Sequence, residues 1–491
     1  MDRQDRVVNL RGRGPGEEDS RTTSRPSRST SARQKQRVQQ QREEEAEESV
    51  PPELAGWIKE RAKALKIRQT DRRWAAEVVN DFRENLLKFL KKNDDQPFFQ
   101  TAEFLTSGSY FEKVKIDSPD EFDMMLRLQA PSRLNITQLD DGLFYRIDLC
   151  RPTRTSIRAF ILEENLTLSS SKILSEMHRL VRKFLKTYRV PDEHCRWVVN
   201  RKRLNSPAVT LSLCRTDENS EELISVDVVP ALEVHSSQGW PPNVRNGPDI
   251  DNWLGKKGRQ EIRSLPCFFV PKRLKGRNLS EEAKESWRIS FSHIEKKIIT
   301  CHGNKKTCCE SNATKCCRKL CLMLLKSLIK GLKHRFPKEL DDLCSYHGKT
   351  VFLHLLSERF EDSMWAPHLL PSCFLRLLGA LEDSVHKGLL PHFFVPQCNL
   401  FSPGVFPRRV LSFLGSALEE QRREGLPLLK PPAPVASLSL ASPPPQDDAP
   451  VSPTQTVPSD TMFHLDLTVM NKQALAFAVA VVCVLFLICV K

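Results

Sequence analysis

Two acidic residues, Glu121 and Asp123, lie two positions apart inside an apolar run of the sequence. Alternate residues of a β-strand share one face, so a strand here would point both carboxylates the same way and Phe122 into the core. Two carboxylates on one face repel each other unless a cation lies between them. Mg²⁺ is commonly held by carboxylates together with substrate phosphates. The pair therefore predicts a divalent metal site at a strand.

A small turn precedes this pair. Ser107, Gly108 and Ser109 offer backbone N–H groups and hydroxyls to a phosphate. A third carboxylate is available on the later run 224–229, where alternation places Asp227 on the polar face and allows it to share a cleft with Glu121. A Gly-Ser turn, Glu-x-Asp and a later Asp are typical of nucleotidyltransferases. In these enzymes two Mg²⁺ ions, or Mn²⁺ in their place, activate a hydroxyl and stabilise the pyrophosphate leaving group.

A second candidate metal site follows further along the chain, where one His and five Cys lie within about twenty residues. Clustered His and Cys match a closed, tetrahedral structural zinc site. The predicted ligands are His302, Cys308, Cys309 and Cys316, with Cys317 and Cys321 as alternates. Lysines surround the cluster, so a zinc-stapled loop here would present a rigid basic surface to a phosphate backbone.

These sites must be positioned by two kinds of structure. Residues 53–92 show helical periodicity, as one helix or as two joined near residues 69–71. The apolar positions of this segment are Trp74, Val78, Phe82, Leu86 and Leu90. Residues 104–236 mix strand and helix patterns, which predicts an α/β lobe on a mixed sheet, and residues 281–424 are mainly helical. The fold class is therefore α+β, with two lobes.

Length and charge agree with this reading. A chain of 491 residues is long enough for a large core and more than one lobe. The formal net charge of +14 favours a polyanionic partner, either nucleic acid or an anionic membrane surface. The 15 cysteines occur without an N-terminal signal peptide, which indicates cytosolic thiols and favours metal binding over disulfides.

Both ends of the chain differ from the middle. Residues 1–52 form a basic, disordered arm, either a sequence-independent nucleic-acid arm or a solvated tail. Residues 426–469 are a Pro- and Ser-rich linker. The final segment, 470–491, contains 17 uninterrupted apolar residues at 474–490, which would span about 26 Å as a helix. We expect a C-terminal anchor in a thin membrane, the endoplasmic reticulum or the mitochondrial outer membrane.

Longer stretches of the sequence resemble the cyclic GMP–AMP synthase family, cytosolic DNA sensors with a bilobal nucleotidyltransferase fold. The stretches are TSGSYFEKVKI, PDEFDMML, NSPAVTLSL, ISVDVVPALE, ESWRISFSHIEKKI, HGNKKTCCE with KCCRK, and SYHGKT. The resemblance covers about residues 53–424. The zinc insertion separates this family from oligoadenylate synthases. The resemblance implies a catalytic lobe with its N-terminal helix at 53–280, and a helical lobe at 281–425 with a zinc loop at 302–321.

The resemblance also implies roles for individual residues. Glu121, Asp123 and Asp227 would hold two Mg²⁺ ions, and one Zn²⁺ would be structural. Nucleotide contacts would come from Ser107, Gly108, Ser109, Lys272, Arg288, Ser290, Ser292, Lys326, Ser345 and Tyr346. Of these, Arg288, Ser290 and Ser292 would contact guanine, and Tyr346 would stack on the other base. DNA-backbone contacts would come from Lys66, Arg68, Lys296, Lys306 and Lys319.

The activity implied is synthesis of cyclic GMP–AMP, with mixed 2′–5′ and 3′–5′ linkages, from ATP and GTP. Double-stranded DNA would activate it independently of sequence, with a dimer forming on the DNA, in the cytoplasm and also the nucleus. The product would be an innate immune second messenger in antiviral defence. Two rival functions stay open: a cyclic dinucleotide synthase activated by double-stranded RNA, and a catalytically inactive nucleic-acid-binding scaffold. Phosphate contacts alone do not separate DNA from RNA.

Three positions and the tail depart from the family pattern. Cys344 stands where a second Ser is usual, and Leu204-Asn205 replaces a Gly-Gly. Met323 stands where a basic DNA contact is common, so we expect weaker DNA binding at that surface. The resemblance covers neither the linker nor the membrane segment.

Overall fold

The computed structural model describes residues 50–430, apart from 163–165, 204, 218–220, 236 and 275–280. Most of the predicted N-terminal arm, nearly all of the linker and the whole of the predicted anchor at 470–491 lie outside these residues, as does Leu204. Among the helices that the structure describes, none is both long and apolar enough to cross a membrane.

The N-terminal helical segment forms two helices, α2 (Pro52–Ala64) and the longer α3 (Gln69–Lys91). The buried stripe of α3 is Ala75, Val79, Phe82, Leu86 and Leu90. Of the apolar positions named from the sequence, Phe82, Leu86 and Leu90 lie in this stripe, Val78 is partly buried against the core, and Trp74 is exposed. A spacing of four residues advances about 40° around a helix at each step, so a strict i, i+4 series leaves the core within a few turns.

Nine described strands form one sheet, in the order β1-β2-β7-β8-β9-β4-β3, with β6 also pairing with β7 and β5 pairing with β6. The strands are β1 (Glu103–Thr106), β2 (Glu121–Gln129), β3 (Leu134–Gln138), β4 (Phe144–Leu149), β5 (Cys195–Val199), β6 (Val209–Arg215), β7 (Glu222–Glu233), β8 (Phe268–Val270) and β9 (Trp287–Ser290). The β2–β7 pair is parallel and the other described pairs are antiparallel. The sheet is therefore mixed, as predicted.

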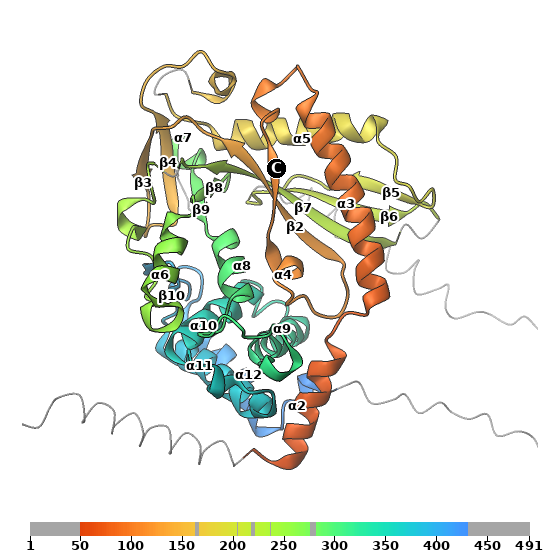
Figure 1. Cartoon of the computed structure of the whole chain (residues 1–491), viewed down its shortest axis with the longest axis vertical. Coiled ribbons are helices and arrows are strands. Elements are labelled where there is room, and N and C mark those ends of the chain that lie inside the picture. The colour runs from red at the N-terminus through yellow and green to blue at the C-terminus, as the bar shows by residue number, and fades with distance from the viewer. Residues whose placement is uncertain are drawn as a thin grey trace, which may run out of the picture. The chain divides into compact units, whose positions relative to one another are not determined.

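Helices α3 and α5 (Ser170–Thr187) lie against the sheet (Figure 1). They are joined by aromatic packing: the ring of Phe82 lies 5.9 Å from that of Phe184 and 4.8 Å from that of Trp197, between ring centroids. Ser169 caps α5, because its hydroxyl accepts a hydrogen bond from the backbone N–H of Lys172 at 3.0 Å. Apolar packing of these helices fixes the sheet that carries the acidic residues.

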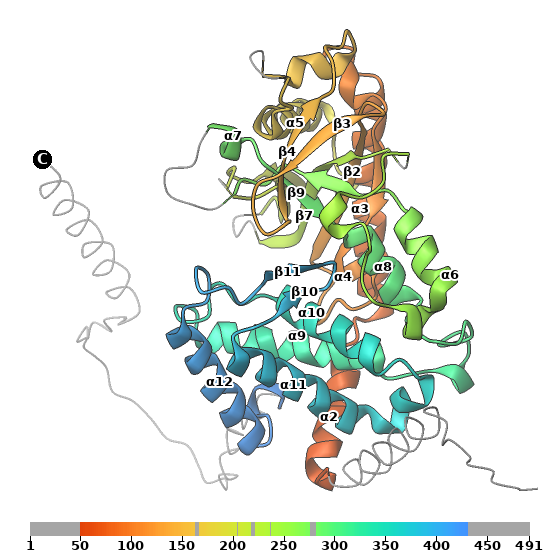
Figure 2. The same cartoon turned by 90° about the vertical axis from the view of Figure 1, so that its left-hand side faces the viewer.

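The second lobe is helical, and Figure 2 shows it below the sheet. Its helices are α9 (Arg318–Arg335), α10 (Ser345–Glu358), α11 (Leu370–Lys387) and α12 (Arg408–Arg423), with a hairpin of β10 (Pro391–His392) and β11 (Val395–Asn399). Helix α2 belongs to this lobe by its contacts, since Arg61 donates to the hydroxyl of Ser327 at 3.0 Å. One apolar core runs through both lobes.

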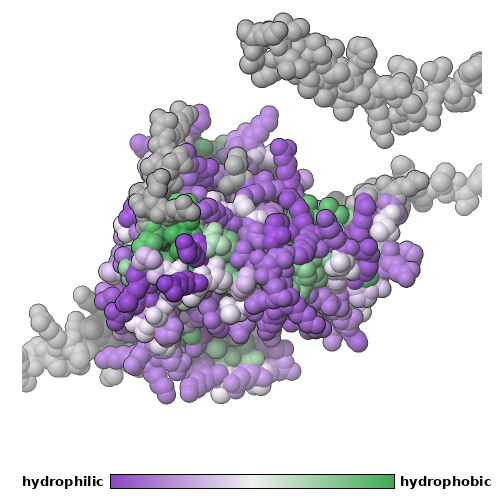
Figure 3. Space-filling view, turned by 90° about the horizontal axis from the view of Figure 1, so that it is seen from above, coloured by the Kyte–Doolittle hydropathy of each residue, from purple (hydrophilic) through white to green (hydrophobic). Residues whose placement is uncertain are grey.

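Shorter elements connect these parts. The remaining α-helices are α4 (Gly108–Phe111), α6 (Asp251–Ser264), α7 (Glu281–Lys284) and α8 (Ser292–Thr300). The 3₁₀ turns are Pro97–Phe99, Ser156–Phe160, Pro242–Val244, Asn312–Thr314, Asp362–Trp365, Pro367–Leu369 and Pro427–Leu429. Helices α4 and α8 lie between the sheet and the helical lobe in both cartoon views (Figures 1 and 2). Seen from above, the described surface is mostly hydrophilic, with small apolar areas (Figure 3).

Candidate active site and metal centre

The phosphate turn, residues 107–109, joins β1 to helix α4. Gly108 has a φ of +81°, in the left-handed region where glycine is favoured. A Cβ at this position would lie 2.2 Å from Oδ2 of Asp123. Glycine is therefore needed both for the turn and for the close approach of its backbone to that carboxylate. Lys296 on α8 supports the turn from behind, because it donates to the carbonyl oxygen of Thr106 at 3.1 Å.

The three acidic residues lie on the two strands that pair in parallel. In the register of β2 and β7, Asp123 is directly opposite Asp227, and Glu121 is opposite Ser225. Phe122 between them is buried in the core. The alternation of the two strands thus brings all three carboxylates to one side of the sheet.

These carboxylates carry more negative charge than their surroundings neutralise. Burial, then the charges of Glu121 and Asp227, raise the pKa of Asp123 to about 6. Burial also raises the pKa of Asp227, although the hydroxyl of Thr210 donates to its Oδ1 at 2.6 Å. Glu121 instead lies beside Lys115, with 2.8 Å between Oε2 and Nζ. Three carboxylates that repel one another on one side of the sheet form a donor set that fits divalent metal ions.

An open cleft of about 820 Å³ lies over this face and is walled by both lobes. Its lining contains the phosphate turn at Gly108 and Ser109, the acidic pair Glu121 and Asp123, and, from the helical lobe, Lys326, Ser345 and Tyr346. Burial, then the charges of Lys349 and Lys115, lower the pKa of Lys326 to about 8. Its Nζ donates to the carbonyl oxygen of Val114 at 3.0 Å, which ties α9 to the segment after the turn.

The other predicted nucleotide residues are not part of the cleft's lining. Arg288 and Ser290 are half-buried on β9, and the hydroxyls of Ser290 and Ser292 lie 3.2 Å apart. Lys272 is half-buried, and its carbonyl oxygen accepts a hydrogen bond from Ser286 at 3.2 Å. Ser107 is buried at the start of the turn.

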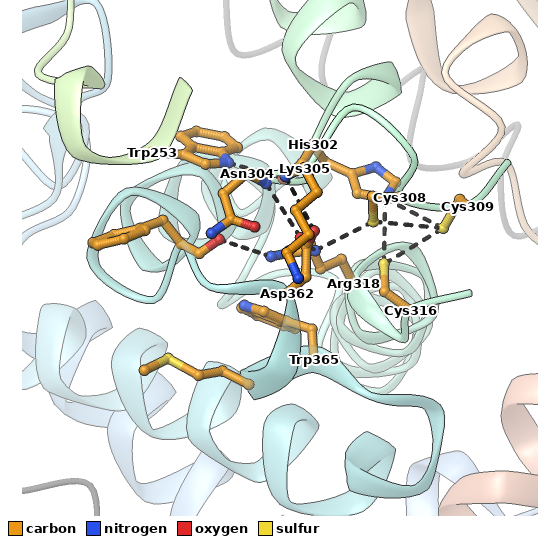
Figure 4. A network of polar contacts seen from close by, with 12 residues as sticks. Trp253, His302, Asn304, Lys305, Cys308, Cys309, Cys316, Arg318, Asp362 and Trp365 are labelled. Atoms are coloured by element: carbon orange, nitrogen blue, oxygen red, sulfur yellow. Dashed lines mark hydrogen bonds and ion pairs between the residues drawn. The ribbon is translucent and has the colours of Figure 1, made fainter. Parts of the chain in front are cut away.

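The second site is a compact His/Cys group (Figure 4). The ligand atoms of His302, Cys308, Cys309 and Cys316 all lie within 4.8 Å of one another, a spacing that the cleft carboxylates do not reach. Nε2 of His302 is 3.2 Å from the sulfur of Cys316 and 3.5 Å from that of Cys309. One imidazole and three thiols at this spacing fit a tetrahedral zinc site.

The surroundings orient this group. The Nδ1–H of His302 donates to the carbonyl oxygen of Ile299 at 2.7 Å, which leaves the lone pair of Nε2 for a metal. A Cβ on Gly303 would lie 2.2 Å from the Cβ of Cys308, so only glycine fits there. The alternates Cys317 and Cys321 are fully buried in the core and lie outside this group.

A buried ion pair behind the zinc group was not predicted from the sequence. The guanidinium of Arg318, whose side chain is 0% exposed, donates to Oδ1 of Asp362 at 2.9 Å and to the carbonyl oxygen of Phe360 at 3.0 Å. It also lies 3.5 Å from the sulfur of Cys308. The same Oδ1 of Asp362 also accepts from the backbone N–H of Asn304 at 3.2 Å, and its Oδ2 accepts from that of Lys305 at 3.1 Å (Figure 4).

The predicted DNA-contact residues differ in exposure. Lys66, Arg68 and Lys306 are exposed, whereas Lys296 and Lys319 are only partly exposed. Burial lowers the pKa of Lys319 and of Lys296. Lys296 already donates to Thr106, so its ammonium group is shared with the phosphate turn.

Two departures from the family pattern have a structural explanation. Met323 is buried in α9, so its own side chain does not reach the surface, and the weaker DNA binding expected there stays a prediction. Cys344 performs the capping task of a serine, since its sulfur accepts from the backbone N–H of His347 at the start of α10. Burial raises the pKa of Cys344, but the hydrogen bond and charge of His347 outweigh it and bring the pKa to about 7.

Comparison with known proteins agrees with this architecture. Residues 110–300 match the Mab-21 protein nucleotidyltransferase domain, and residues 317–419 match the Mab-21 protein HhH/H2TH-like domain. Cyclic GMP-AMP synthase of Mus musculus is 39% identical over 372 residues, which cover 76% of this chain and 70% of that protein. The protein of the same name from Sus scrofa is 37% identical over 358 residues, covering 72% and 68%. A cyclic GMP-AMP synthase-like receptor of Magallana gigas is 26% identical over 352 residues, covering 71% and 53%.

Fold and site together define an enzyme of the nucleotidyltransferase class, with a helical lobe next to a His/Cys group that fits a zinc site. Within that class, the chain belongs to the cyclic GMP–AMP synthase family.

Proposed function

We propose that this enzyme makes cyclic GMP–AMP from ATP and GTP, with mixed 2′–5′ and 3′–5′ linkages, when double-stranded DNA binds it. The observation that carries the proposal is the direct contact between the phosphate turn and the acidic strand pair: Gly108 lies against Asp123, which lies opposite Asp227. A triphosphate on the turn would therefore meet the metal-binding carboxylates at once. Membership of the cyclic GMP–AMP synthase family supports the choice of product.

In this proposal, the chain's own residues bind and orient the nucleotides. Backbone N–H groups at Gly108 and Ser109 bind phosphate oxygens, and Lys326 from α9 adds positive charge to the same wall of the cleft. Tyr346 provides a flat ring for a base. Arg288, with Ser290 and Ser292, contacts the guanine. These groups fix one nucleotide in line with the attacking hydroxyl of the other.

The acidic residues Glu121, Asp123 and Asp227 would hold two divalent cations. Bound there, the metal ions lower the pKa of the attacking hydroxyl and neutralise the developing charge on the pyrophosphate. The raised pKa of Asp123 shows the cost of holding these carboxylates together without a cation.

Binding to DNA is assigned to the basic residues Lys66, Arg68, Lys296, Lys306 and Lys319. Lys66 and Arg68 lie between α2 and α3, Lys296 and Lys319 lie on α8 and α9, and Lys306 lies in the zinc loop. No single recognition helix carries these residues, as expected for contacts to phosphates rather than base edges. Binding should therefore be independent of sequence and should weaken steeply with salt. A strong preference for one duplex sequence at constant salt would contradict this assignment.

The decisive experiment is to incubate the purified protein with ATP, GTP and Mg²⁺, with no activator, with duplex DNA or with duplex RNA. Mass spectrometry and a linkage-specific nuclease digest then identify the product. We expect cyclic GMP–AMP with mixed linkages in the DNA reaction alone. Formation with RNA alone would support the RNA-activated alternative. No product with either, while DNA still binds, would support the inactive scaffold.

A further inference from the structure

A buried cluster of charges lies behind the cleft, between its two lobes. Nζ of Lys349 on α10 lies 2.8 Å from Oε1 of Glu112 and 3.1 Å from Oε2 of Glu295. The side chains are 16%, 0% and 5% exposed respectively. Glu112 closes helix α4 directly after the phosphate turn, and Glu295 lies on α8. One ammonium group therefore joins three elements that are far apart in the sequence.

The surroundings shift the pKa values of these three groups in different directions. Burial raises the pKa of Glu112, and Lys349 counteracts only part of that shift. Burial also raises the pKa of Glu295, but the charge and hydrogen bond of Lys349 outweigh it, so the net pKa is lowered. Lys349 is correspondingly held in its charged form, since the two carboxylates raise its pKa despite burial. Without this lysine, two buried carboxylates would face each other unpaired.

The cluster continues to the base-stacking residue. Nδ1 of His392 accepts from the backbone N–H of Phe394 at 3.2 Å, so the neutral ring carries its proton on Nε2. That Nε2–H lies 2.8 Å from the hydroxyl oxygen of Tyr346 and donates to it. The hydroxyl of Tyr346 in turn donates to Oε1 of Glu295 at 2.9 Å. Burial lowers the pKa of His392 to about 4, which keeps this direction of donation at neutral pH.

A continuous series of hydrogen bonds thus leads from the β10–β11 hairpin to the phosphate turn: His392, Tyr346, Glu295, Lys349 and Glu112. The series passes through the ring of Tyr346, on which a base would stack, and ends at Glu112, the C-cap of the helix that begins with Gly108 and Ser109. Tyr346, Lys349 and the turn at Gly108 and Ser109 line the cleft. Within the series, Lys349 links the part next to the phosphate turn, at Glu112, to the part next to Tyr346, at Glu295.

We propose that Lys349 is a positioning residue that sets the separation between the triphosphate-binding turn and the base platform at Tyr346. This rests on the proposed function, because it assumes that a nucleoside triphosphate occupies both surfaces. A ligand that touches both surfaces gains affinity only if they are held at the matching distance. A ligand that touches one surface needs no such tie.

The test compares the affinities of AMP and of a non-hydrolysable ATP analogue by calorimetry, so that no turnover is required. The main variant is Lys349→Met with Glu112→Gln, which removes the tie without leaving the Glu112 charge buried and unpaired. Glu295 keeps its bond to Tyr346 there. We expect the affinity for AMP to stay within about twofold of wild type. The ratio of the affinity for the ATP analogue to that for AMP, which measures what the β- and γ-phosphates add, should fall about tenfold.

The mirror variant is His392→Ala, which releases the base platform and leaves the turn tied. We expect AMP affinity to fall while the ratio between the ATP analogue and AMP is kept. The control is Lys330→Met, the same substitution at a cleft-lining lysine that pairs with Asp117 at 2.6 Å and has a 66% exposed side chain. It should change neither quantity by more than about twofold, as for an exposed ion pair.

Equal losses for both ligands in the main variant would mean general damage to the fold and would overturn the inference, as would no change for either ligand. A wild-type protein that binds both nucleotides as stated, yet forms no cyclic product, would overturn the proposed function and leave this inference intact.

Discussion

A buried cation contacts the cleft and another contacts the zinc loop, and the two contacts differ in kind. Lys349 is a compact ammonium group between two carboxylates, and its side chain remains 16% exposed at the edge of an open cleft. Arg318 is a planar guanidinium, 0% exposed, that contacts one carboxylate, one carbonyl oxygen and one metal-ligand sulfur at fixed angles. The guanidinium suits a rigid, closed site, whereas the ammonium group suits carboxylates that adjust when a ligand enters.

The carboxylates differ in the same way. Asp362 at the zinc loop is fully used, with partners on both of its oxygens. In the cleft, Oε2 of Glu112 is buried without a partner, and Asp123 and Asp227 repel Glu121. The carboxylate at the zinc loop is thus satisfied by the protein around it, although Nε of Arg318 is buried without a partner, whereas the carboxylates at the cleft are not. A catalytic site that awaits metal ions and substrate has unmet charge, while a structural site has little.

The largest expected effect comes from removing one charge from the unsatisfied region. Asp227→Asn should lower synthesis by roughly 10³-fold or more, because one carboxylate fewer disorders both metal ions. The metal-free fold should be at least as stable as wild type, since burial makes the charged form of Asp227 costly. Product formation and thermal unfolding in the presence of EDTA measure the two effects. Turnover close to wild type would refute the three-carboxylate assignment.

Removing two predicted zinc ligands should instead destabilise the zinc loop. Cys308→Ala with Cys309→Ala should lose zinc and DNA-stimulated synthesis, because a structural zinc site stabilises its own loop. The sheet lobe should keep its fold, since the loop lies outside it. Metal analysis, DNA-binding titrations and circular dichroism test these three statements, with Cys150→Ala, an exposed cysteine on the sheet lobe, as the matched control. A wild-type protein without zinc would invalidate the assignment.

The pH dependence of stability should distinguish the two regions as well. The folded-state pKa of Asp123, about 6, exceeds its ordinary value of 3.8, so the native state binds more protons than the unfolded state between these pH values. This group therefore destabilises the metal-free protein at pH 7, by up to about 3 kcal/mol, and that penalty disappears as pH falls through 6 towards 4.

Comparison with Asp123→Asn isolates this effect from the buried histidines, which are shared by both proteins. In urea unfolding with EDTA, the variant should be the more stable at pH 7 and the two should converge near pH 4. Saturating Mg²⁺ should shrink the gap, because the metal binds the charged native form. A gap that is independent of pH would show that the raised pKa does not arise from the native cluster.

The smallest expected effect concerns the geometry of the buried guanidinium. Arg318→Lys keeps the charge but loses the fork that reaches Asp362 and Phe360 together. We expect about tenfold faster loss of zinc to a chelator, in the range found for residues that support metal ligands. Lys319→Arg, the reverse exchange at the next position, should leave zinc release unchanged. Equal release rates for Arg318→Lys and wild type would show that the guanidinium does not support the site.

Short sequence patterns were sufficient to predict much of the acidic site and of the His/Cys group. Strand alternation predicted that Phe122 is buried and that Glu121 and Asp123 share a face. The His/Cys spacing predicted the four residues that the structure groups, and quoted motifs indicated the family. In each case, neighbours in sequence carry the signal.

Contacts between distant residues could not be predicted in this way. Lys349 pairs with Glu112 across 237 positions, and Arg318 pairs with Asp362 across 44. No periodicity marks such pairs, because each depends on how whole helices pack. Trp74 shows a different limit of sequence patterns. It continues the spacing of four that includes Phe82, but it is exposed, because a helix of 3.6 residues per turn rotates such a series away from the core.

The parallel pairing of β2 with β7 also has a consequence for how the enzyme is made. Asp123 and Asp227 meet across a connection of about a hundred residues, and among the described strands theirs is the one parallel pair. Closing so long a loop costs chain entropy that only later contacts repay, so this pairing is slow compared with the hairpins beside it. During synthesis, the phosphate turn and two carboxylates leave the ribosome well before the third. A nascent or truncated chain that ends before β7 therefore holds half of a catalytic centre and has no activity, however well its helices have formed.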